Sequence, residues 1–409
     1  MDLIALAVPF FLLLLLVELL VDRIRRTGHY RSNDAINSLS AGILSTTSGY
    51  FTKIVQWAIW GYVFSQFAIF EMQRDWFNAS ASGILLWIIA AVAWDFCYYW
   101  NHRLGHEISI LWAAHAVHHQ SEDYNLSTAL RQTSTSFLFS WIFYVPLLLI
   151  GFPVDVLITV GAINLIYQFW VHTQQVNRLG MLDRILVTPS NHRVHHAQNE
   201  RYIDKNYGGI LILWDRLFGT FAEESDEDPV VFGVRKPLAN WNPFWANFQV
   251  YDYLLFDARH TQRWRDKIGL WFRRTGWRPA DVAARYPKAA ADLRQFRKFD
   301  PALSPRQSYY VMGQFLVVVV LTLFIADIFA RQGATAVLVP CLLLWAHLYT
   351  LGMLNEGRPN AARFEMLRLF VVVPLAMFAL DDAVLAITAM HWAIVALYIL
   401  VSFLCLKKS

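Results

Sequence analysis

Cysteine is scarce in this chain of 409 residues, which contains only Cys97, Cys341 and Cys405. All three lie in or beside apolar stretches, so the sequence offers no disulfide framework. None lies within the histidine-rich motifs of the chain, which argues against a thiolate metal site and against an iron–sulfur cluster. Any metal chemistry must therefore depend on other ligands.

Charged residues are few as well: they make up 16% of the chain, with a formal net charge of +4. The basic residues are spread among apolar stretches and one polar insert, and the lack of a basic domain argues against nucleic-acid binding. We detect no internal repeat, although many transporters contain one. Hydrophobic residues instead make up 56% of the chain and aromatic residues 15%, which indicates an integral membrane protein.

Histidine is concentrated in three motifs that lie in two stretches of the chain. On a helix, residues i, i+3 and i+4 lie on one face, so each motif can direct its imidazoles toward one point. Eight imidazoles are too many for one tetrahedral metal, which predicts a site for two metal ions. Imidazole suits iron, zinc, copper or nickel, and the residues alone do not choose among them. The motifs are an HxxxH at His102 and His106, an HxxHH at His115, His118 and His119, and a second HxxHH at His192, His195 and His196.

The remaining histidines lie outside these motifs. His172 directly follows the apolar stretch 154–171, which is expected to return the chain to the face that carries the first two motifs. The other four stand alone, so we predict structural or packing roles for them; they are His29, His260, His347 and His391.

Nine apolar stretches predict membrane helices. The first is followed by Arg23, Arg25 and Arg26 and has no evident cleavage site, so it predicts an uncleaved transmembrane helix with a cytoplasmic C-terminal end. The fourth and fifth are short for a full span of about 20 residues, which leaves a shallow re-entrant pair as an alternative. The stretches are 3–21, 41–70, 83–100, 137–150, 154–171, 309–330, 334–353, 366–380 and 383–406.

These stretches favour an all-α fold: a multi-pass membrane helical bundle of about nine membrane segments, with a histidine-rich two-metal site on its cytoplasmic side. Alternating the segments from Arg23 places both histidine-rich stretches, the polar residues 173–305 and the C-terminal lysines on one side, as the positive-inside rule requires. We expect residues 1–305 to form the metal domain, with N-terminal membrane segments and a cytoplasmic insert. Residues 306–409 are expected to form a C-terminal four-segment membrane region.

Asp95 is an ionisable residue at the end of the third apolar stretch. At membrane depth such a residue predicts a functional contact. The alternative is that Asp95 lies at the interface and caps or orients a neighbour, such as a metal-binding histidine.

The three histidine motifs on a multi-pass chain resemble the fatty acid hydroxylase / sterol desaturase superfamily of membrane di-iron oxygenases. Within that superfamily, the sequence around the motifs is similar to that of the glyceryl-ether monooxygenases. The stretches that carry this closer resemblance are HRLGHEISILWAAHAVHHQSEDYNLSTALRQ at 102–132, SNHRVHHAQN around the third motif, and IDKNYGGILILWDRLFGTF at 203–221. The apolar C-terminal third also fits, so the resemblance covers nearly the whole chain.

The resemblance implies roles for particular residues. Glu107 matches an acidic position beside the first motif. Its alternative roles are those of a metal ligand, an orienting residue, a proton donor or a plain surface residue. We expect Glu107 and Asp95 to be the catalytic residues. His172 matches an additional histidine of the family. Residues in the matching stretches without a derivable role are Asp123, Tyr124, Asn125, Asn206 and Tyr207. The expected ligands of two iron ions are His102, His106, His115, His118, His119, His172, His192, His195 and His196.

The reaction that the resemblance implies is hydroxylation of the O-alkyl carbon of an ether lipid, an alkylglycerol. The product is a hemiacetal, which breaks down to a fatty aldehyde and a glycerol derivative. Breaking such a C–H bond requires a metal that activates O2, because side chains alone cannot do it. The resemblance further implies tetrahydrobiopterin as the electron donor, with a redox protein as the alternative. No motif in the sequence marks a pterin site.

The membrane places further expectations on the substrate. A long alkyl chain prefers the bilayer, so it is expected to reach the metals sideways between helices, with segments such as 137–171 lining its path. The membrane itself is expected to be the bacterial inner membrane or the endoplasmic reticulum, with the active site on the cytoplasmic side.

Two other functions fit parts of this pattern. The same motifs suit a di-iron hydroxylase or desaturase of another lipid, such as a sterol, fatty acid, sphingolipid or carotenoid. The third hypothesis is a metal transporter or an inactive scaffold. It is disfavoured because all the motif histidines are present and no repeat is detected.

Overall fold

The structure, a computed structural model, describes residues 3–289, 291–381 and 387–408. Within these ranges the regular structure is entirely helical, and the only β-type pairings are three isolated bridges. The all-α prediction is therefore confirmed for the described residues.

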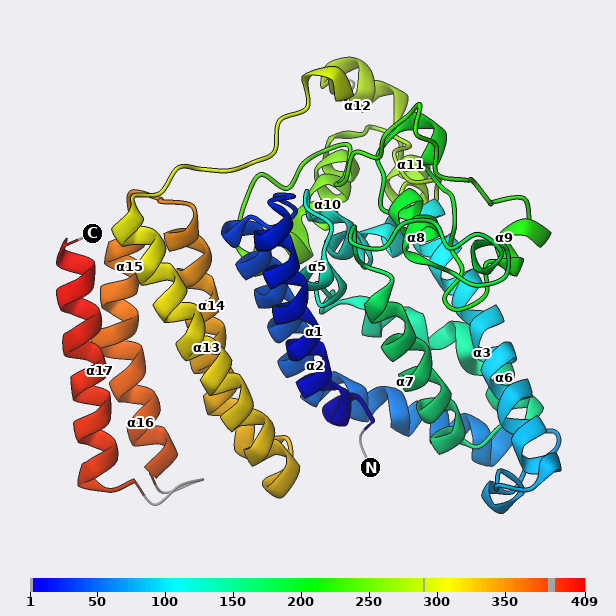
Figure 1. Cartoon of the computed structure of the whole chain (residues 1–409), viewed down its shortest axis with the longest axis horizontal. Helices are drawn as coiled ribbons and strands as arrows, with labels where there is room; N and C mark the ends of the chain where they lie inside the picture. The colour runs from blue at the N-terminus through cyan, green and yellow to red at the C-terminus, as the bar shows by residue number, and fades with distance from the viewer. Residues whose placement is uncertain (1–2, 290, 382–386, 409) are drawn as a thin grey trace.

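The N-terminal helices form the half of the molecule that carries the histidines (Figure 1). Three long helices run along this half, and a hairpin of shorter helices packs against them. The last histidine of the first motif lies one residue before the end of α3. The helices are α1 (Leu3–Arg25), α2 (Ser32–Phe67), α3 (Ala81–Glu107), α4 (Ser109–Ala113), α5 (Leu126–Ala129), α6 (Val145–Ile150) and α7 (Val154–Trp170), with a 3-10 helix η2 (Ala116–Gln120) between α4 and α5.

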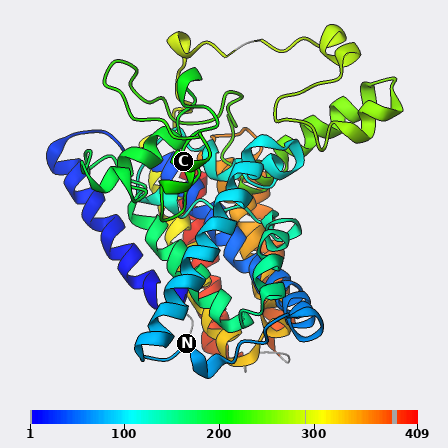
Figure 2. The ribbon, with the colours of Figure 1, turned by 90° about the vertical axis from the view of Figure 1, so that its right-hand side faces the viewer.

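The polar insert lies over one end of these helices and is mostly irregular. Figure 2 shows that it also projects sideways beyond the bundle. It covers the C-terminal end of α3, so the first histidine motif lies beneath it rather than in open solvent. Its helices are α8 (Pro189–His195), α9 (Leu213–Leu217), α10 (Pro243–His260), α11 (Trp264–Gly269) and α12 (Ala280–Arg285).

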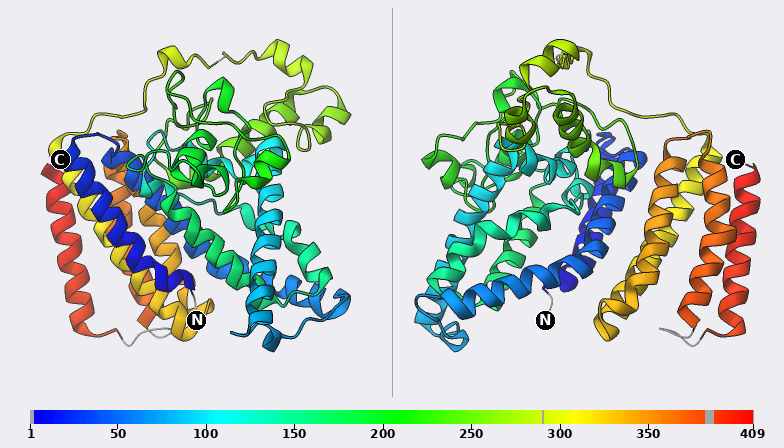
Figure 3. Two further views of the ribbon diagram at one scale, coloured as in Figure 1. Left: turned by 45° about the vertical axis from the view of Figure 1, so that its right-hand side comes forward. Right: turned by 180° about the vertical axis from the view of Figure 1, so that it is seen from behind.

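The C-terminal helices stand beside the N-terminal half, as the two views of Figure 3 show. Ser304 and Gln307 form a reciprocal cap at the start of α13, with N···O distances of 3.2 and 2.9 Å. The predicted boundary at 305/306 therefore falls at a helix start, and the division into two domains stays a prediction. The helices are α13 (Pro305–Gln332), α14 (Leu338–Asn355), α15 (Ala361–Leu367), α16 (Val373–Asp381) and α17 (Ala389–Lys408), with a π-helical turn (Arg368–Val372) joining α15 to α16.

Four helical stretches of the described chain are long and apolar enough to cross a membrane: Ala81–Glu107, Pro305–Gln332, Thr335–Asn355 and Ala389–Leu406. Many large apolar side chains point outward along the helices, as lipid contact requires; Phe10 is 66% exposed and Val320 65%. The chain thus has the helices of a multi-pass membrane protein. The count of nine membrane segments stays a prediction, and the start of the ninth, residues 383–386, lies outside the described residues.

Two apolar clusters hold the helices together. One joins α2, α3 and the α6–α7 hairpin, where Trp94 stacks on Tyr144 with ring centroids 3.9 Å apart. The other packs Leu44 of α2 against Val318 of α13 and Leu344 of α14. Because α2 contributes to both clusters, the C-terminal helices are packed directly onto the half that carries the histidines.

Candidate metal centre

The first histidine motif lies on the last turns of α3. Residues four apart on a helix differ by only about 40° around its axis, so His102 and His106 point to the same side. Their side chains are almost fully buried, because the polar insert covers this end of the helix. The third motif lies on the short helix α8, which begins with Pro189 at its first turn, a position that proline favours.

The nine predicted histidines converge in two groups. In each group, one ring nitrogen from every histidine lies within 4.8 Å of those of the others. All but His115, which is partly exposed, are buried. The first histidine group is His102, His106, His115, His119 and His195, and the second histidine group is His118, His172, His192 and His196.

Each HxxHH motif is divided between the two groups, which differs from the expectation that one motif points to one place. His115 and His119 belong to the first group, and His118 belongs to the second. In the third motif, His192 and His196 join the second group, while His195 crosses to the first. The pairs four apart stay together because about 100° separates positions i+3 and i+4 on a helix. One motif can therefore serve two neighbouring metal ions.

Backbone carbonyls fix the rings of four of these histidines through Nδ1. A carbonyl can only accept, so each Nδ1 carries the proton and Nε2 presents a lone pair to the centre. The four bonds are His102 to Tyr207 at 2.8 Å, His118 to Arg131 at 2.9 Å, His172 to Gln168 at 2.8 Å and His195 to Lys205 at 3.0 Å.

Three of these buried Nε2 atoms have no hydrogen-bond partner among the described residues, although buried polar atoms require one. In the first group, Nε2 of His102, His106 and His195 is buried without a hydrogen-bond partner. In the second group, Nε2 of His172 lies 3.1 Å from Nε2 of His118 and 3.0 Å from Nε2 of His192. His118 and His172 already have their protons on Nδ1, so their facing nitrogens repel unless a cation lies between them. The donor set therefore fits two metal ions.

Electrostatics keep these imidazoles in the form that binds metal. Burial lowers the pKa of His118 to about 4. Burial, followed by neighbouring histidines, also lowers the pKa of others well below the ordinary value; these are His115, His119, His192, His195 and His196. They are therefore neutral at pH 7, as metal ligation requires.

Asp95 lies in α3 but hydrogen-bonds to no histidine. Its carboxylate accepts four hydrogen bonds, from the amides of Ile210 and Leu211 at 2.8 and 3.0 Å, from Trp214 Nε1 at 3.0 Å and from Asn164 Nδ2 at 2.8 Å. These contacts tie α3 to α7 and to the loop that supplies the Tyr207 carbonyl. The geometry fits the orienting alternative better than direct contact with substrate.

A second buried carboxylate, not singled out from the sequence, holds the same loop. Asp215 accepts from the amides of Tyr207 at 2.7 Å and Gly208 at 2.8 Å, and burial raises its pKa to about 6. Gly209 allows the loop to approach α3, because a Cβ there would lie 2.7 Å from Asp95 Oδ1. These contacts explain why this stretch accompanies the histidine motifs.

Glu107 lies at the end of α3, just after the first motif. Its carboxylate pairs with Arg103 at 3.0 Å, and both side chains are about one quarter exposed. No contact between the Glu107 side chain and a histidine is observed within the described residues. Its catalytic role stays a prediction.

Other residues of the matching stretches make contacts near the histidines or in the adjoining segments. The Tyr124 ring stacks on His172 with centroids 5.6 Å apart, and its hydroxyl donates to the Val171 carbonyl at 2.9 Å. Asn125 caps α5 by accepting from Ser127 N at 3.0 Å. Asp123 accepts from Arg31 and Lys298 at 3.1 and 2.6 Å.

The third motif is braced by the same loop. Asn206 donates from Nδ2 to the Asn191 carbonyl at 3.0 Å, which fixes α8. The Tyr207 ring packs on His106 at 5.4 Å between centroids. The side chain of Tyr207 is thus a contact of the first group that sequence reasoning missed.

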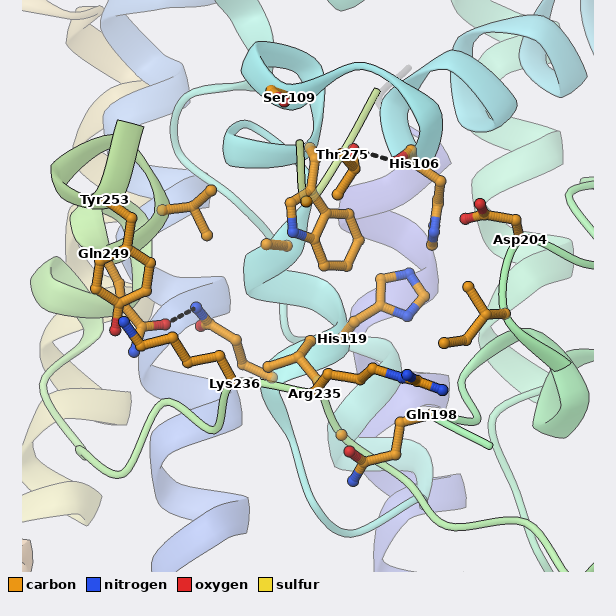
Figure 4. A pocket seen from close by; sticks show the side chains of 18 of the residues that line it. His106, Ser109, His119, Gln198, Asp204, Arg235, Lys236, Gln249, Tyr253 and Thr275 are labelled. Atoms are coloured by element: carbon orange, nitrogen blue, oxygen red, sulfur yellow. Dashed lines mark hydrogen bonds between the residues drawn. The ribbon is translucent and has the colours of Figure 1, made fainter. Parts of the chain in front are cut away.

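A cavity of about 460 Å³ opens beside the histidines, on the side of the polar insert. Figure 4 shows His106 and His119 toward one end, and Lys236, Gln249 and Tyr253 toward the other. Its volume lies within the range of small-molecule sites, about 300–1,000 Å³. The centre is therefore accessible to a ligand from this side.

The sequence around the centre is similar to that of known proteins. The sequence profile of the fatty acid hydroxylase family matches residues 87–220, a range that contains all nine histidines. Alkylglycerol monooxygenase from Danio rerio is 39% identical over 380 residues, covering 91% of this chain and 82% of the relative. The human alkylglycerol monooxygenase is 36% identical over 377 residues, with the same coverage. The chain belongs to the alkylglycerol monooxygenase family.

A relative with a different name matches a shorter region of the chain. The ornithine lipid hydroxylase OlsE of Rhizobium tropici is 35% identical over 153 residues, which cover 37% of this chain and 46% of the relative. No solved structure matches the chain. Membership of the alkylglycerol monooxygenase family thus rests on nearly the whole chain, whereas the similarity to OlsE covers about a third of it.

Proposed function

We propose that this protein is a membrane di-iron monooxygenase that hydroxylates the O-alkyl carbon of alkylglycerol ether lipids. The observation that carries this proposal is the convergence of nine imidazoles in two groups, in a member of the alkylglycerol monooxygenase family. The hydroxylated carbon is a hemiacetal, which breaks down to a fatty aldehyde and a glycerol derivative. The reaction is therefore an oxygenase reaction that ends in cleavage of the ether.

The two histidine groups are the proposed iron ligands. Iron held there would supply the activation of O2 that breaking a C–H bond requires. The protein contributes ring orientation, because backbone carbonyls fix Nδ1 of four histidines. It also contributes burial, which keeps the imidazoles neutral.

Asp95 and Glu107 have different proposed roles. Asp95 acts as a positioning residue, because it fixes the loop whose Tyr207 carbonyl orients His102. Glu107 is the proposed proton carrier, since it is partly exposed at the end of α3 and adjoins His106 in the chain. The Glu107 carboxylate is thus within reach of solvent.

We place the centre on the cytoplasmic side of the bacterial inner membrane or the endoplasmic reticulum. The C-terminal end of α1, with Arg23 and Arg25, lies at the same end of the molecule as α8 and the polar insert (Figure 1). Arg25 contacts Gln175 of the insert at 3.2 Å. Basic residues at one end of the helices support this orientation.

Tetrahydrobiopterin is the proposed reductant, and a redox protein is the alternative. Either must deliver two electrons for each O2, because one oxygen atom enters the lipid and the other leaves as water. The assay below distinguishes the two donors by supplying the pterin alone.

The test uses detergent-purified full-length protein. Metal analysis should find about two irons per chain, one for each histidine group. Incubation with 1-O-hexadecylglycerol, tetrahydrobiopterin and O2 should release hexadecanal. Folded protein that binds no iron would overturn the di-iron proposal. Iron without pterin-dependent aldehyde, but with aldehyde after a redox protein is added, would replace only the proposed donor.

A second candidate is hydroxylation of another lipid at the same centre. The similarity to ornithine lipid hydroxylase OlsE favours it, because that similarity shows that related sequences are hydroxylases of a different lipid. An iron-loaded protein that hydroxylates such a lipid, and leaves alkylglycerol intact with either donor, would decide for this candidate.

A further inference from the structure

The cavity beside the histidines has an excess of positive charge at its far end. Lys236, Arg278, Lys288 and Asp257 all line the cavity. Lys236 and Lys288 both lie over the Tyr253 ring, and Asp257 lies beside Arg278 and Lys288, which groups the four residues at the end that Tyr253 marks. Figure 4 shows Lys236 next to Tyr253, away from the labelled histidines. Three cations and one carboxylate leave an excess of two positive charges.

The carboxylate is already engaged. Arg278 binds both oxygens of Asp257, at 2.7 and 2.8 Å, and also donates to the Tyr286 carbonyl at 2.7 Å. Lys288 Nζ lies 4.0 Å from Asp257, at the limit of an ion pair. Lys236 Nζ lies 3.1 Å from the centre of the Tyr253 ring, and no carboxylate of the described chain is within ion-pair distance of it. Lys236 is therefore available to an anion.

Electrostatics agree with this geometry. Burial lowers the pKa of Lys236, and the nearby charges of Lys288 and Arg278 lower it further, against smaller opposing contributions from Asp252 and Asp257. Burial also lowers the pKa of Lys288. A bound anion would relieve the repulsion among the three cations.

The position of this charge relative to the histidines points to one part of an ether lipid. The carbon to be hydroxylated is bonded to the ether oxygen, so the alkyl chain leaves it in one direction and the glycerol in the other. Positive charge offers nothing to an alkyl chain, whereas it suits a polar head. Gln120 and Gln249 also line the cavity, and their amides hydrogen-bond to each other at 3.3 Å and to backbone carbonyls.

We propose that the far end of the cavity binds the phosphate of a phosphorylated ether lipid, so that an anionic alkylglycerol phosphate is the preferred substrate. This inference rests on the proposed function, because it names the substrate class for the same centre. Lys236 acts as a specificity residue: it contacts the head and takes no part in the oxidation.

The test compares two substrates on the iron-loaded full-length enzyme: 1-O-hexadecylglycerol and its 3-phosphate. Wild-type protein should have the higher kcat/KM for the phosphate. Lys236→Met should lower kcat/KM for the phosphate about tenfold, mainly through KM, since a charged hydrogen bond is lost. It should leave kcat/KM for the neutral lipid within about twofold, as electrostatic discrimination requires. Lys236→Arg should retain the preference.

A charge-matched control separates this effect from general surface charge. Arg265 lies on α11, is exposed and does not line the cavity, so Arg265→Met should leave the preference unchanged. Equal losses on both substrates in Lys236→Met would overturn the inference, because they would indicate a structural role or a site for the reductant. An unchanged preference in that variant would overturn it as well.

Equilibrium binding, measured by quenching of tryptophan fluorescence, requires no turnover. The phosphorylated lipid should bind wild-type protein more tightly than the neutral lipid, and Lys236→Met should remove that difference. This result would stand even if neither lipid were cleaved, in which case the proposed function alone would fail. If inorganic phosphate bound as tightly as the phosphorylated lipid, the site would belong to free phosphate and the inference would be wrong.

Discussion

In the C-terminal helices, Glu365 and Arg368 form a buried ion pair at 2.6 Å, and each has further partners. Arg368 also donates to Gln314 and Tyr398 at 3.1 and 2.8 Å, while Glu365 accepts from Tyr310 at 2.7 Å. In the histidine centre the contrast is marked, because several buried Nε2 atoms have no partner. A network in which every polar group has a partner stabilises helix packing, whereas buried polar atoms without partners indicate a ligand site.

A single buried imidazole without hydrogen-bond partners is not sufficient to indicate a metal site. Both ring nitrogens of His347 in α14 are buried without a partner in the described part of the chain, yet His347 belongs to neither histidine group. What distinguishes the centre is convergence: nine histidines from α3, η2, the end of α7 and α8 bring their nitrogens together. The comparison therefore predicts that removing a histidine of the centre releases metal, whereas removing His347 from the C-terminal helices does not.

The largest expected effect is that of removing a histidine of the centre. His195→Ala deletes an unpartnered Nε2 of the first group, so we expect loss of iron and a fall in aldehyde release of at least about 100-fold, since even indirect disturbance of a metal site costs about 10–100-fold. The measurements are iron content and the aldehyde assay on folded protein. His347→Asn is the matched control, and it should retain both. Equal iron loss in the control would contradict the distinction between the two regions.

A smaller effect is expected at Glu107. Glu107→Gln should retain iron but lower kcat about 100-fold if the carboxylate carries a proton, within the range of general acid–base catalysis. Arg103→Gln is the control, because it breaks the same pair and leaves the carboxylate in place. Similar losses in both variants would show that the ion pair matters instead. Stability should change by no more than about 1 kcal/mol in either variant, since the pair is partly exposed.

The sequence was sufficient to predict the helical fold and the residues that meet in the centre. Spacing of the motif histidines carried the prediction, and His172 was added by family resemblance. The division of each HxxHH motif between two groups was not foreseen. The motif at His115–His119 runs into a 3-10 helix, and positions i+3 and i+4 point in different directions even on a regular helix.

The supporting contacts could not be predicted for a physical reason. The acceptors that fix His102, His118 and His195 are backbone carbonyls, which every residue possesses and no side-chain pattern marks. The partners of Asp95 lie between 69 and 119 residues away in the chain, so only the folded loop reveals them. The cationic end of the cavity likewise combines residues from separate segments of the insert.

Asp95 in the half that carries the histidines can be compared with Glu365 in the C-terminal helices. Both are buried and fully engaged, but only Asp95 holds a loop that orients a histidine. Asp95→Asn turns an amide toward N–H donors, so the free energy of unfolding should fall by about 1–3 kcal/mol. Iron affinity should fall about tenfold, as is typical when an orienting contact is lost.

Glu365→Gln should lower the free energy of unfolding by a larger amount, about 3–5 kcal/mol, because Arg368 remains buried without its counter-charge. Iron affinity should nevertheless stay the same. Thermal unfolding in detergent and competition with a chelator measure the two quantities separately. If Glu365→Gln weakened iron binding as much as Asp95→Asn, the loss would follow general destabilisation, and Asp95 would have no specific role in positioning the centre. If only Asp95→Asn weakened it, the loop contact would be the cause, because the more stable of the two variants would be the one that loses the metal.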